Sequence, residues 1–255
     1  MSTASDQLRK LAIVPAYNEE GMVAKVVRDI QRAAPGFDVL VVDDGSTDRT
    51  AAEAEATDAT VIRHPFNLGI GGAMQTGFKY ALAHGYDVAA QVDGDGQHKT
   101  EYLEELLAAL RTNGQADMVC GSRFLEDPGY KVPIGRRLGN LIFSVVLTLI
   151  VRRRITDPTS GFRMTNRRGI ELFARDYPHD YPEVEAVVMV HAHRLRSAEV
   201  PVTMRPRITG VSSIDATGSA IYMTKVLLAI FIGLVRARPV VEAGDEAPVM
   251  AGSGM

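Results

Sequence analysis

Short apolar runs that alternate with helix-like segments dominate the first half of this chain of 255 residues. Runs of this length are typical of strands that are buried on both faces of a sheet. Strand-then-helix alternation predicts a mainly parallel, Rossmann-like central sheet with helices on both faces, so the predicted fold class is α/β. The five runs are Leu11–Val14, Val39–Val42, Thr60–Arg63, Val88–Val92 and Met118–Gly121.

Three of these strands end in residues that could bind a ligand. Pro15 follows the first strand, Asp43 and Asp44 the second, and Asp93 and Asp95 the fourth. In sheets of this class, ligands bind beyond the carboxyl ends of the strands. Asp and Gly are also ordinary turn residues, so an acidic turn is the alternative explanation of the fourth strand end. The agreement of three strand ends favours a binding site over a turn.

The carboxylates at the fourth strand end suit a divalent cation. Asp93 and Asp95 are one residue apart, so both side chains can face one site, and the glycines between and after them leave room for a ligand. With the amide of Gln97 they offer the hard oxygen donors that Mg²⁺ or Mn²⁺ prefers, and the cation could neutralise a departing diphosphate. Side chains that could stack on a base, or accept hydrogen bonds from a base or ribose, lie nearby: Tyr17, Glu19, Asp43 and Asp44.

Arginines precede the long apolar run Leu138–Val151 in the second half, and Arg152–Arg154 closes it. Guanidinium groups match phosphate oxygens, so Arg123 and Arg136 could hold an anionic acceptor. This run and a second one, Ala220–Val235, fall short of the roughly 20 residues that span a bilayer. Basic flanks favour helices that lie in a membrane interface, and a buried core helix with a solvated basic end is the alternative.

Composition narrows the setting of the protein. The net charge of −3 does not indicate a protein that binds nucleic acid. The single cysteine, Cys120, excludes an internal disulfide, fits a reducing compartment, and is expected to be a buried structural thiol. The N-terminal residues are polar, with no apolar segment of the kind that a signal peptide contains.

Five short motifs occur in a characteristic order, and together they resemble the family 2 glycosyltransferases with the GT-A fold. The later segment Asp157–Arg163 is similar to the polyprenyl-phosphate (dolichol-phosphate) mannosyl- and glucosyltransferase subgroup. The resemblance covers about the first two-thirds of the chain. The five motifs are Pro15–Glu19, Val42–Asp48, Asn67–Gly69, Asp93–His98 and Gly121–Arg123.

The resemblance implies inverting transfer of a sugar from a GDP- or UDP-linked donor, with Mg²⁺ or Mn²⁺ as cofactor. It also implies roles for individual residues. The expected catalytic residues are Asp95, Arg123 and Asp157, and the expected metal ligands are Asp93, Asp95 and Gln97. The expected nucleotide-sugar pocket comprises Pro15, Tyr17, Glu19, Asp43, Asp44, Asn67, Gly69 and Asp93. The expected acceptor-phosphate site comprises Arg123, Arg136, Asn140 and Arg163.

The chemistry of the acceptor remains open at this point. A phosphate acceptor is already ionised near neutral pH and needs no strong general base. A sugar hydroxyl would need one, and Asp157, Glu183 and Glu185 are the candidates, although Asp157 could instead cap a loop next to Pro158. The chain also departs from the subgroup pattern, because Lys99 replaces a common proline and the C-terminal transmembrane segments of some members are missing.

We therefore predict transfer to polyprenyl phosphate by a cytoplasmic enzyme bound peripherally to the inner membrane face, and a small membrane protein is a further candidate partner. One alternative is transfer to a hydroxyl of a lipid-linked or cell-wall glycan. Another is a non-catalytic nucleotide-sugar-binding scaffold for a membrane partner. The predicted organisation is a donor-binding half (1–121) and an acceptor-binding half (122–209) of one GT-A domain, a C-terminal apolar helix (210–240) and a disordered tail (241–255).

Overall fold

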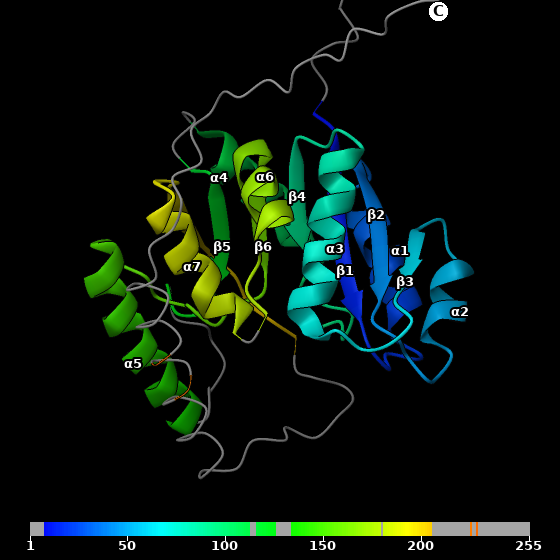
Figure 1. The fold of residues 1–255 in the computed structure, drawn as a ribbon, viewed down its shortest axis with the longest axis horizontal. Coiled ribbons are helices and arrows are strands. Elements are labelled where there is room, and N and C mark those ends of the chain that lie inside the picture. Colours follow the sequence, from blue (N-terminus) through cyan, green and yellow to red (C-terminus); the bar gives the residue numbers. More distant parts are fainter. Residues whose placement is uncertain are drawn as a thin grey trace, which may run out of the picture.

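A computed structural model describes residues 8–112, 116–125, 134–179 and 181–205, together with Lys225 and Leu228. The side chains of residues 134–138 are not among those described. Apart from Lys225 and Leu228, the predicted C-terminal helix (210–240) and tail (241–255) lie outside these residues. The described chain forms one α/β unit around a twisted sheet (Figure 1).

The sheet has seven strands in the order β3-β2-β1-β4-β6-β5-β7, and all of its neighbouring pairs are parallel except those of β6. Its strands are β1 (Lys10–Ala16), β2 (Phe37–Asp43), β3 (Thr60–Arg63), β4 (Val88–Gln91), β5 (Met118–Ser122), β6 (Arg163–Asn166) and β7 (Ser197–Pro201). The helices are α1 (Val23–Ala33), α2 (Thr50–Glu55), α3 (Gly69–Ala83), η1 (Thr100–Tyr102), α4 (Leu103–Arg111), α5 (Ile134–Val151), α6 (Arg167–Arg175) and α7 (Pro182–Ala192).

Both faces of the central strands β1 and β2 are buried, which explains why these strands are largely apolar. Leu11 and Ile13 of β1 pack into a core that α3, α5, α6 and α7 cover, together with the β5 thiol Cys120. Ala12 and Val14 of the same strand pack into a second core, under α1, α2 and α4. Adjacent residues of a strand point to opposite faces, so a strand that is covered on both faces is apolar at consecutive positions. The predicted class and helix placement are confirmed.

The structure corrects several boundaries in the predicted elements. The glycine-rich segment 69–72 predicts a loop that leads into a helix from about residue 73, but α3 begins at Gly69. The sequence also predicts Thr100 as a helix cap, but Thr100 lies in η1 and its hydroxyl donates to the carbonyl of Asp29. Residues 187–195 fit a helix or a strand from their sequence, and most of them belong to helix α7. Strand β6 was not predicted, and its four residues lie between β4 and β5, antiparallel to both.

Helix α5 is apolar on two opposite faces. Phe143, Leu147 and Val151 pack into the core beside α7. On the other face, Leu141, Val145 and Leu149 recur every four residues, with 57%, 50% and 72% of their surface exposed. The sequence left two interpretations of this segment, an interfacial helix and a buried core helix. Each of them describes one face of α5. Among the described residues, no helix is both long and apolar enough to cross a membrane.

The sheet opens between β1 and β4 at Pro15. The backbone of Ile13 faces β4, and its carbonyl accepts from the amide of Val92. Pro15 is two residues further along β1 and faces the same side, but the register of β4 against β1 ends at Gln91. A proline has no N–H to leave unpaired there. The two strands separate at this point, at the switch in strand order where ligands bind in such sheets.

Candidate active site

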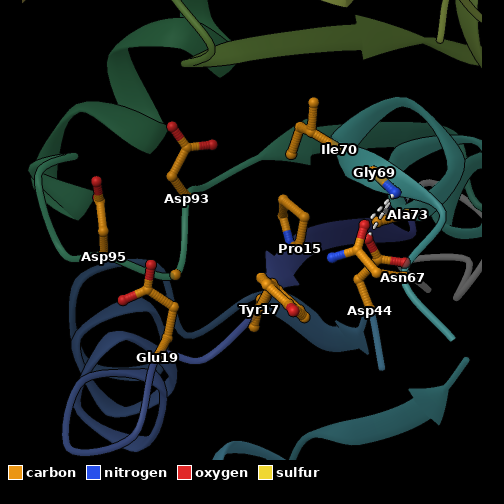
Figure 2. A pocket seen from close by; sticks show the side chains of 12 residues that line it. Pro15, Tyr17, Glu19, Asp44, Asn67, Gly69, Ile70, Ala73, Asp93 and Asp95 are labelled. Atoms are coloured by element: carbon orange, nitrogen blue, oxygen red, sulfur yellow. Dashed lines mark hydrogen bonds between the residues drawn. The ribbon is translucent and has the colours of Figure 1, made fainter. Parts of the chain in front are cut away.

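A cavity of about 280 Å³ occupies this opening at the carboxyl ends of β1, β2 and β4 (Figure 2). It brings together most of the donor-side residues that the sequence predicted. Gly94, which the sequence predicted to leave room for a ligand, also lines it, as do Ala16, Ile70 and Ala73, which had not been given a role. The predicted residues that line it are Pro15, Tyr17, Glu19, Asp44, Asn67, Gly69, Asp93 and Asp95.

Asp44 ties the start of α3 to the end of β2. Its carboxylate accepts hydrogen bonds from the amides of Leu68 at 2.9 Å and Gly69 at 2.8 Å, and Nδ1 of His64 lies 2.7 Å from it. The Asn67 side chain accepts from the same Gly69 amide at 2.9 Å (Figure 2). Most of the acceptor capacity of Asp44 thus holds the loop that forms one wall of the cavity.

A second loop carries Tyr17 and Glu19, and side chains from the start of α2 hold its backbone. The amide of Asn18 donates to Ser46 Oγ at 3.0 Å, and that of Glu19 donates to Thr50 Oγ1 at 2.8 Å. Asn18 has a φ of 53°, a conformation that asparagine tolerates better than most residues. Tyr17 is 47% exposed and lines the cavity wall, where a flat ligand could stack on its ring.

Buried polar groups hold the Asp93 carboxylate in place. The Gln91 side-chain amide donates to Asp93 Oδ1 at 3.0 Å. The Asp93 backbone amide donates to Nδ1 of the buried His98 at 3.0 Å, so the ring carries its proton on Nε2, which lies 3.4 Å from Asp93 Oδ2. The His98 ring stacks on Phe162 with centroids 4.7 Å apart. Residues of the 157–163 loop therefore support the side chain that the sequence predicted to bind a metal.

The fit of these residues to a divalent cation rests on Asp93 and Asp95, whose carboxylates line one cavity. Gln97 does not line it, and its backbone and side-chain amides both donate to Asp95. Gly94 between the carboxylates packs against the Pro15 carbonyl, where a Cβ atom would lie 3.1 Å from the oxygen. Within the described part of the chain, no three acidic, histidine or cysteine side chains form a metal-binding group. Two hard oxygen donors suit a cation that takes its other ligands from diphosphate and water.

The predicted acceptor-side residues form a second cluster around a tight ion pair. Arg123 Nε and Nη2 donate to the two carboxylate oxygens of Asp157 at 2.6 and 2.8 Å, and the Arg123 amide donates to the same group at 3.0 Å. The Asp157 side chain is fully buried, whereas 18% of the Arg123 side chain is exposed. Arg123 also donates to the Thr159 hydroxyl at 2.8 Å. Asp157 is thus fully engaged in neutralising an arginine.

Two other predicted acceptor residues serve the frame of this cluster. The Asn140 amide donates to the Thr156 carbonyl at 2.8 Å. Arg163 is buried, and its guanidinium donates to the carbonyls of Ser160, Pro158 and Glu183. Its Nη1 has no hydrogen-bond partner among the described residues. These bonds favour a structural role for Arg163 over contact with an acceptor. The side chain of Arg136 lies outside the described side chains.

The remaining candidates lie apart from the cavity lining. Asp43 is buried, accepts from the Ser46 amide at 3.3 Å and lies 3.6 Å from Arg63. Burial raises the pKa of the Glu183 carboxyl above its usual 4.5, with a smaller opposing effect of Arg163. Burial likewise raises the pKa of the Cys120 thiol to about 11, which fits the predicted structural role of this residue.

Sequence patterns missed the residues that support these groups. Glu199 comes from the edge strand β7 and accepts hydrogen bonds from the 156–157 segment. Gly161 lies so close to Asp93 that an added Cβ atom would be 3.2 Å from Oδ2. A lone Glu or Gly has no local signature, because these contacts join positions far apart in the chain. The motif around His98 was the one signal that could have led to its supporting role.

Comparison with known proteins gives relatives that share this architecture. The family model described as glycosyl transferase family 2 matches residues 11–173. The undecaprenyl-phosphate mannosyltransferase of Micrococcus luteus is 34% identical over 82% of this chain and 88% of its own. The polyprenol monophosphomannose synthase of Mycolicibacterium smegmatis is 31% identical over 88% of each chain.

Solved structures show the same fold. The glucosyl-3-phosphoglycerate synthase of Mycobacterium tuberculosis, solved with Mn²⁺, UDP and glucosyl-3-phosphoglycerate, superposes with a TM-score of 0.67. That match is 20% identical in sequence and covers 89% of this chain and 79% of the synthase. The GT-A fold expected from the motifs is thereby confirmed. The family match spans more than half of the chain, so this protein belongs to glycosyl transferase family 2.

Proposed function

We propose that this protein transfers a sugar from a nucleotide-diphosphate sugar to polyprenyl phosphate, with inversion at the sugar carbon. The names of the Micrococcus and Mycolicibacterium relatives support a polyprenyl-phosphate acceptor and make mannose the first sugar to test. The observation that carries the proposal is the Arg123–Asp157 pair. Both oxygens of Asp157 accept from a guanidinium, so this carboxylate is poorly suited to remove a proton from a hydroxyl. A phosphate acceptor needs no such base.

On the donor side, Tyr17 would stack on the base of a GDP- or UDP-linked sugar at the cavity wall. Asp93 and Asp95 would hold Mg²⁺ or Mn²⁺ against the diphosphate, and the bound cation would supply Lewis-acid stabilisation of the leaving group. Gln91 and His98 keep Asp93 oriented toward the cavity. The chain's own contribution at this end is thus to orient the donor and to fix the carboxylates.

On the acceptor side, Arg123 would contact the phosphate oxygens, with Arg136 of α5 as a second cation. Asn140 and Arg163 would hold the backbone at Thr156 and Ser160. The role proposed for these two residues is therefore positioning, not direct contact with the phosphate. The 157–163 loop, the acceptor loop, would bring the phosphate toward the donor, because a Cβ atom added at Gly161 of this loop would lie 3.2 Å from Asp93 Oδ2. Direct in-line attack requires the two substrates to meet at this point.

Helix α5 would place the enzyme on the inner face of the cell membrane. Its outward stripe of Leu141, Val145 and Leu149 is apolar, and the exposed residues Arg152–Arg154 follow its C-terminal end. An apolar stripe beside basic residues suits an interface that contains anionic lipid. A membrane-protein partner would be a second occupant of the same stripe.

The acceptor is tested with radiolabelled GDP-mannose, and then other GDP- and UDP-sugars, against polyprenyl phosphate and lipid-linked saccharides, with Mg²⁺ or Mn²⁺ present. Lipid-soluble product on polyprenyl phosphate is expected, and it should fall at least about 100-fold in Arg123→Gln. Arg32→Gln, on the exposed surface of α1, is the matched control. Product on a saccharide alone would reject the phosphate acceptor. Donor binding without product on any acceptor would favour a scaffold.

The membrane contact is tested by flotation with vesicles of anionic phospholipid. The protein is expected to float, and replacing Leu141, Val145 and Leu149 by serine should leave it at the bottom of the gradient. Arg153→Gln with Arg154→Gln should weaken flotation mainly at low salt, because screening already removes surface attraction at high salt. Equal flotation of the serine variant would reject α5 as the contact.

A further inference from the structure

Glu199 on the edge strand β7 makes an unusual set of hydrogen bonds. Its carboxylate accepts from the backbone amide of Thr156 at 2.9 Å, from the Thr156 hydroxyl at 2.8 Å and from the amide of Asp157 at 3.0 Å. Among the described residues, no lysine, arginine or histidine forms an ion pair with it. The carboxylate therefore serves to hold the backbone immediately before Pro158.

A chain of hydroxyl groups extends this contact to the end of β5. Because the Thr156 hydroxyl gives its proton to Glu199, the Ser122 hydroxyl 2.6 Å away must be the donor in their mutual bond. Ser122 Oγ in turn accepts from the amide of Phe124 at 3.2 Å. Glu199 thus fixes both the segment before Asp157 and the segment around Arg123, which meet in the ion pair.

Sheet pairing makes Glu199 a rigid support. Strands β5 and β7 are parallel neighbours, with Cys120 opposite Glu199 and Ser122 opposite Pro201. The carboxylate thus comes from the strand beside the one that leads into Arg123. Hydrogen bonds to a charged group are stronger than neutral ones, and a carboxylate offers acceptor positions on both oxygens. An amide side chain in its place would have only one acceptor oxygen.

We propose that Glu199 is a positioning residue that orients the Arg123–Asp157 pair toward the acceptor phosphate. The inference rests on the proposed function only for the identity of the acceptor. Loss of the carboxylate would free the Thr156 and Asp157 amides, and Asp157 would then shift with its bound arginine. The donor cavity would keep its shape, because Phe162, on which His98 stacks, is held separately by the Gly121 amide of β5. In the described chain, none of the lining residues forms a hydrogen bond with Glu199.

The test compares Glu199→Ala, Glu199→Gln and the control Glu104→Ala, which changes an exposed residue of α4. In Glu199→Ala, kcat/KM for the acceptor is expected to fall roughly 10- to 100-fold, since small misplacements of a binding group are costly. The dissociation constant of UDP or GDP with Mn²⁺ should change less than about twofold, because the donor cavity is intact. Glu199→Gln should recover much of the loss, because one oxygen can still accept from both backbone amides.

Hydrogen exchange measures the positioning without any substrate. Peptides covering residues 154–163 should exchange faster in Glu199→Ala than in the wild type, and those covering residues 88–98 should not. Unchanged exchange at 154–163, or a loss confined to donor binding, would overturn the proposal. If Glu199→Ala does not fold, Thr156→Val replaces it, and the same directions of change are required. Absence of wild-type transfer to polyprenyl phosphate would reject the proposed function, while the exchange result would still decide the role of Glu199.

Discussion

Replacing Gly161 by alanine should damage the proposed metal site with little effect on the stability of the protein. Gly161 lies in the acceptor loop, and its Cα is close to the Gln91–Asp93 pair. A methyl group there would lie 3.0 Å from Gln91 Nε2, 3.2 Å from Asp93 Oδ2 and 3.4 Å from Asp93 Oδ1. The first two contacts are shorter than ordinary van der Waals separations, so the two side chains must move by a few tenths of an ångström.

The expected magnitudes follow from this crowding. Overpacking costs about 1 kcal/mol at the mild end of its range. Gly161 does not have a positive φ, so alanine can adopt its backbone conformation. Alanine also restricts the unfolded chain, which stabilises the folded protein by roughly 0.4–1 kcal/mol. The net change in unfolding free energy should be below about 1 kcal/mol. Moving a reacting group by 1 Å costs about 100-fold in rate, so a shift of a few tenths should cost roughly tenfold.

The assay makes three measurements on Gly161→Ala. Binding of Mn²⁺ in the presence of UDP or GDP, followed by electron paramagnetic resonance, should weaken, turnover should fall roughly tenfold, and urea unfolding should change little. Gly36→Ala is the control, because the methyl there meets only the flexible end of Lys10. Wild-type Mn²⁺ affinity and turnover in Gly161→Ala would show that the loop does not set the position of Asp93.

Other substitutions test separate parts of the site. Asp95→Asn should lower kcat at least about 100-fold, close to 3 kcal/mol, while the melting temperature stays within a few degrees; full turnover at saturating metal would contradict the metal role. Asp157→Asn should lower the unfolding free energy by about 3 kcal/mol in urea, because Arg123 loses its buried counter-charge; a loss of turnover at unchanged stability would instead indicate a general base. Burial raises the pKa of Glu183, so the folded protein binds this proton more tightly than the unfolded chain does. That stabilisation is complete below the usual pKa of 4.5 and is lost as the pH rises through the folded value, so Glu183→Gln should gain stability relative to the wild type as the pH rises above 4.5. A difference that does not vary with pH would refute this.

The sequence was sufficient to predict the donor half of the fold. Its strands are continuous apolar runs because both faces are buried, and a parallel strand buried in this way is recognisable from its composition alone. The residues at the strand ends could also be placed, since parallel strands bring their carboxyl ends to one edge. This is why Pro15, Asp44 and Asp93 were correctly expected to lie together.

The acceptor half depended on contacts that no local pattern records. Strand β6 is short and partly polar, and it is a strand because β4 and β5 flank it. The partners Arg123 and Asp157 are 34 residues apart, so their ion pair could not be distinguished from two separate ligands. The α5 pattern predicted an apolar helix, but which face is buried depends on α7 and the core.

The position of β6 limits how this enzyme could be divided or recombined. A fragment ending at residue 121 would retain β4 and most of β5 but lack β6 and β7, which would leave one edge of β4 and both edges of β5 unpaired and prone to aggregation. A chimaera that imports another acceptor half would have to reproduce the pairing of Gln91 with Arg163. A register error at this pair would carry over to Gln91 and hence to Asp93. Acceptor preference and donor geometry are therefore expected to diverge together among relatives, rather than as exchangeable modules.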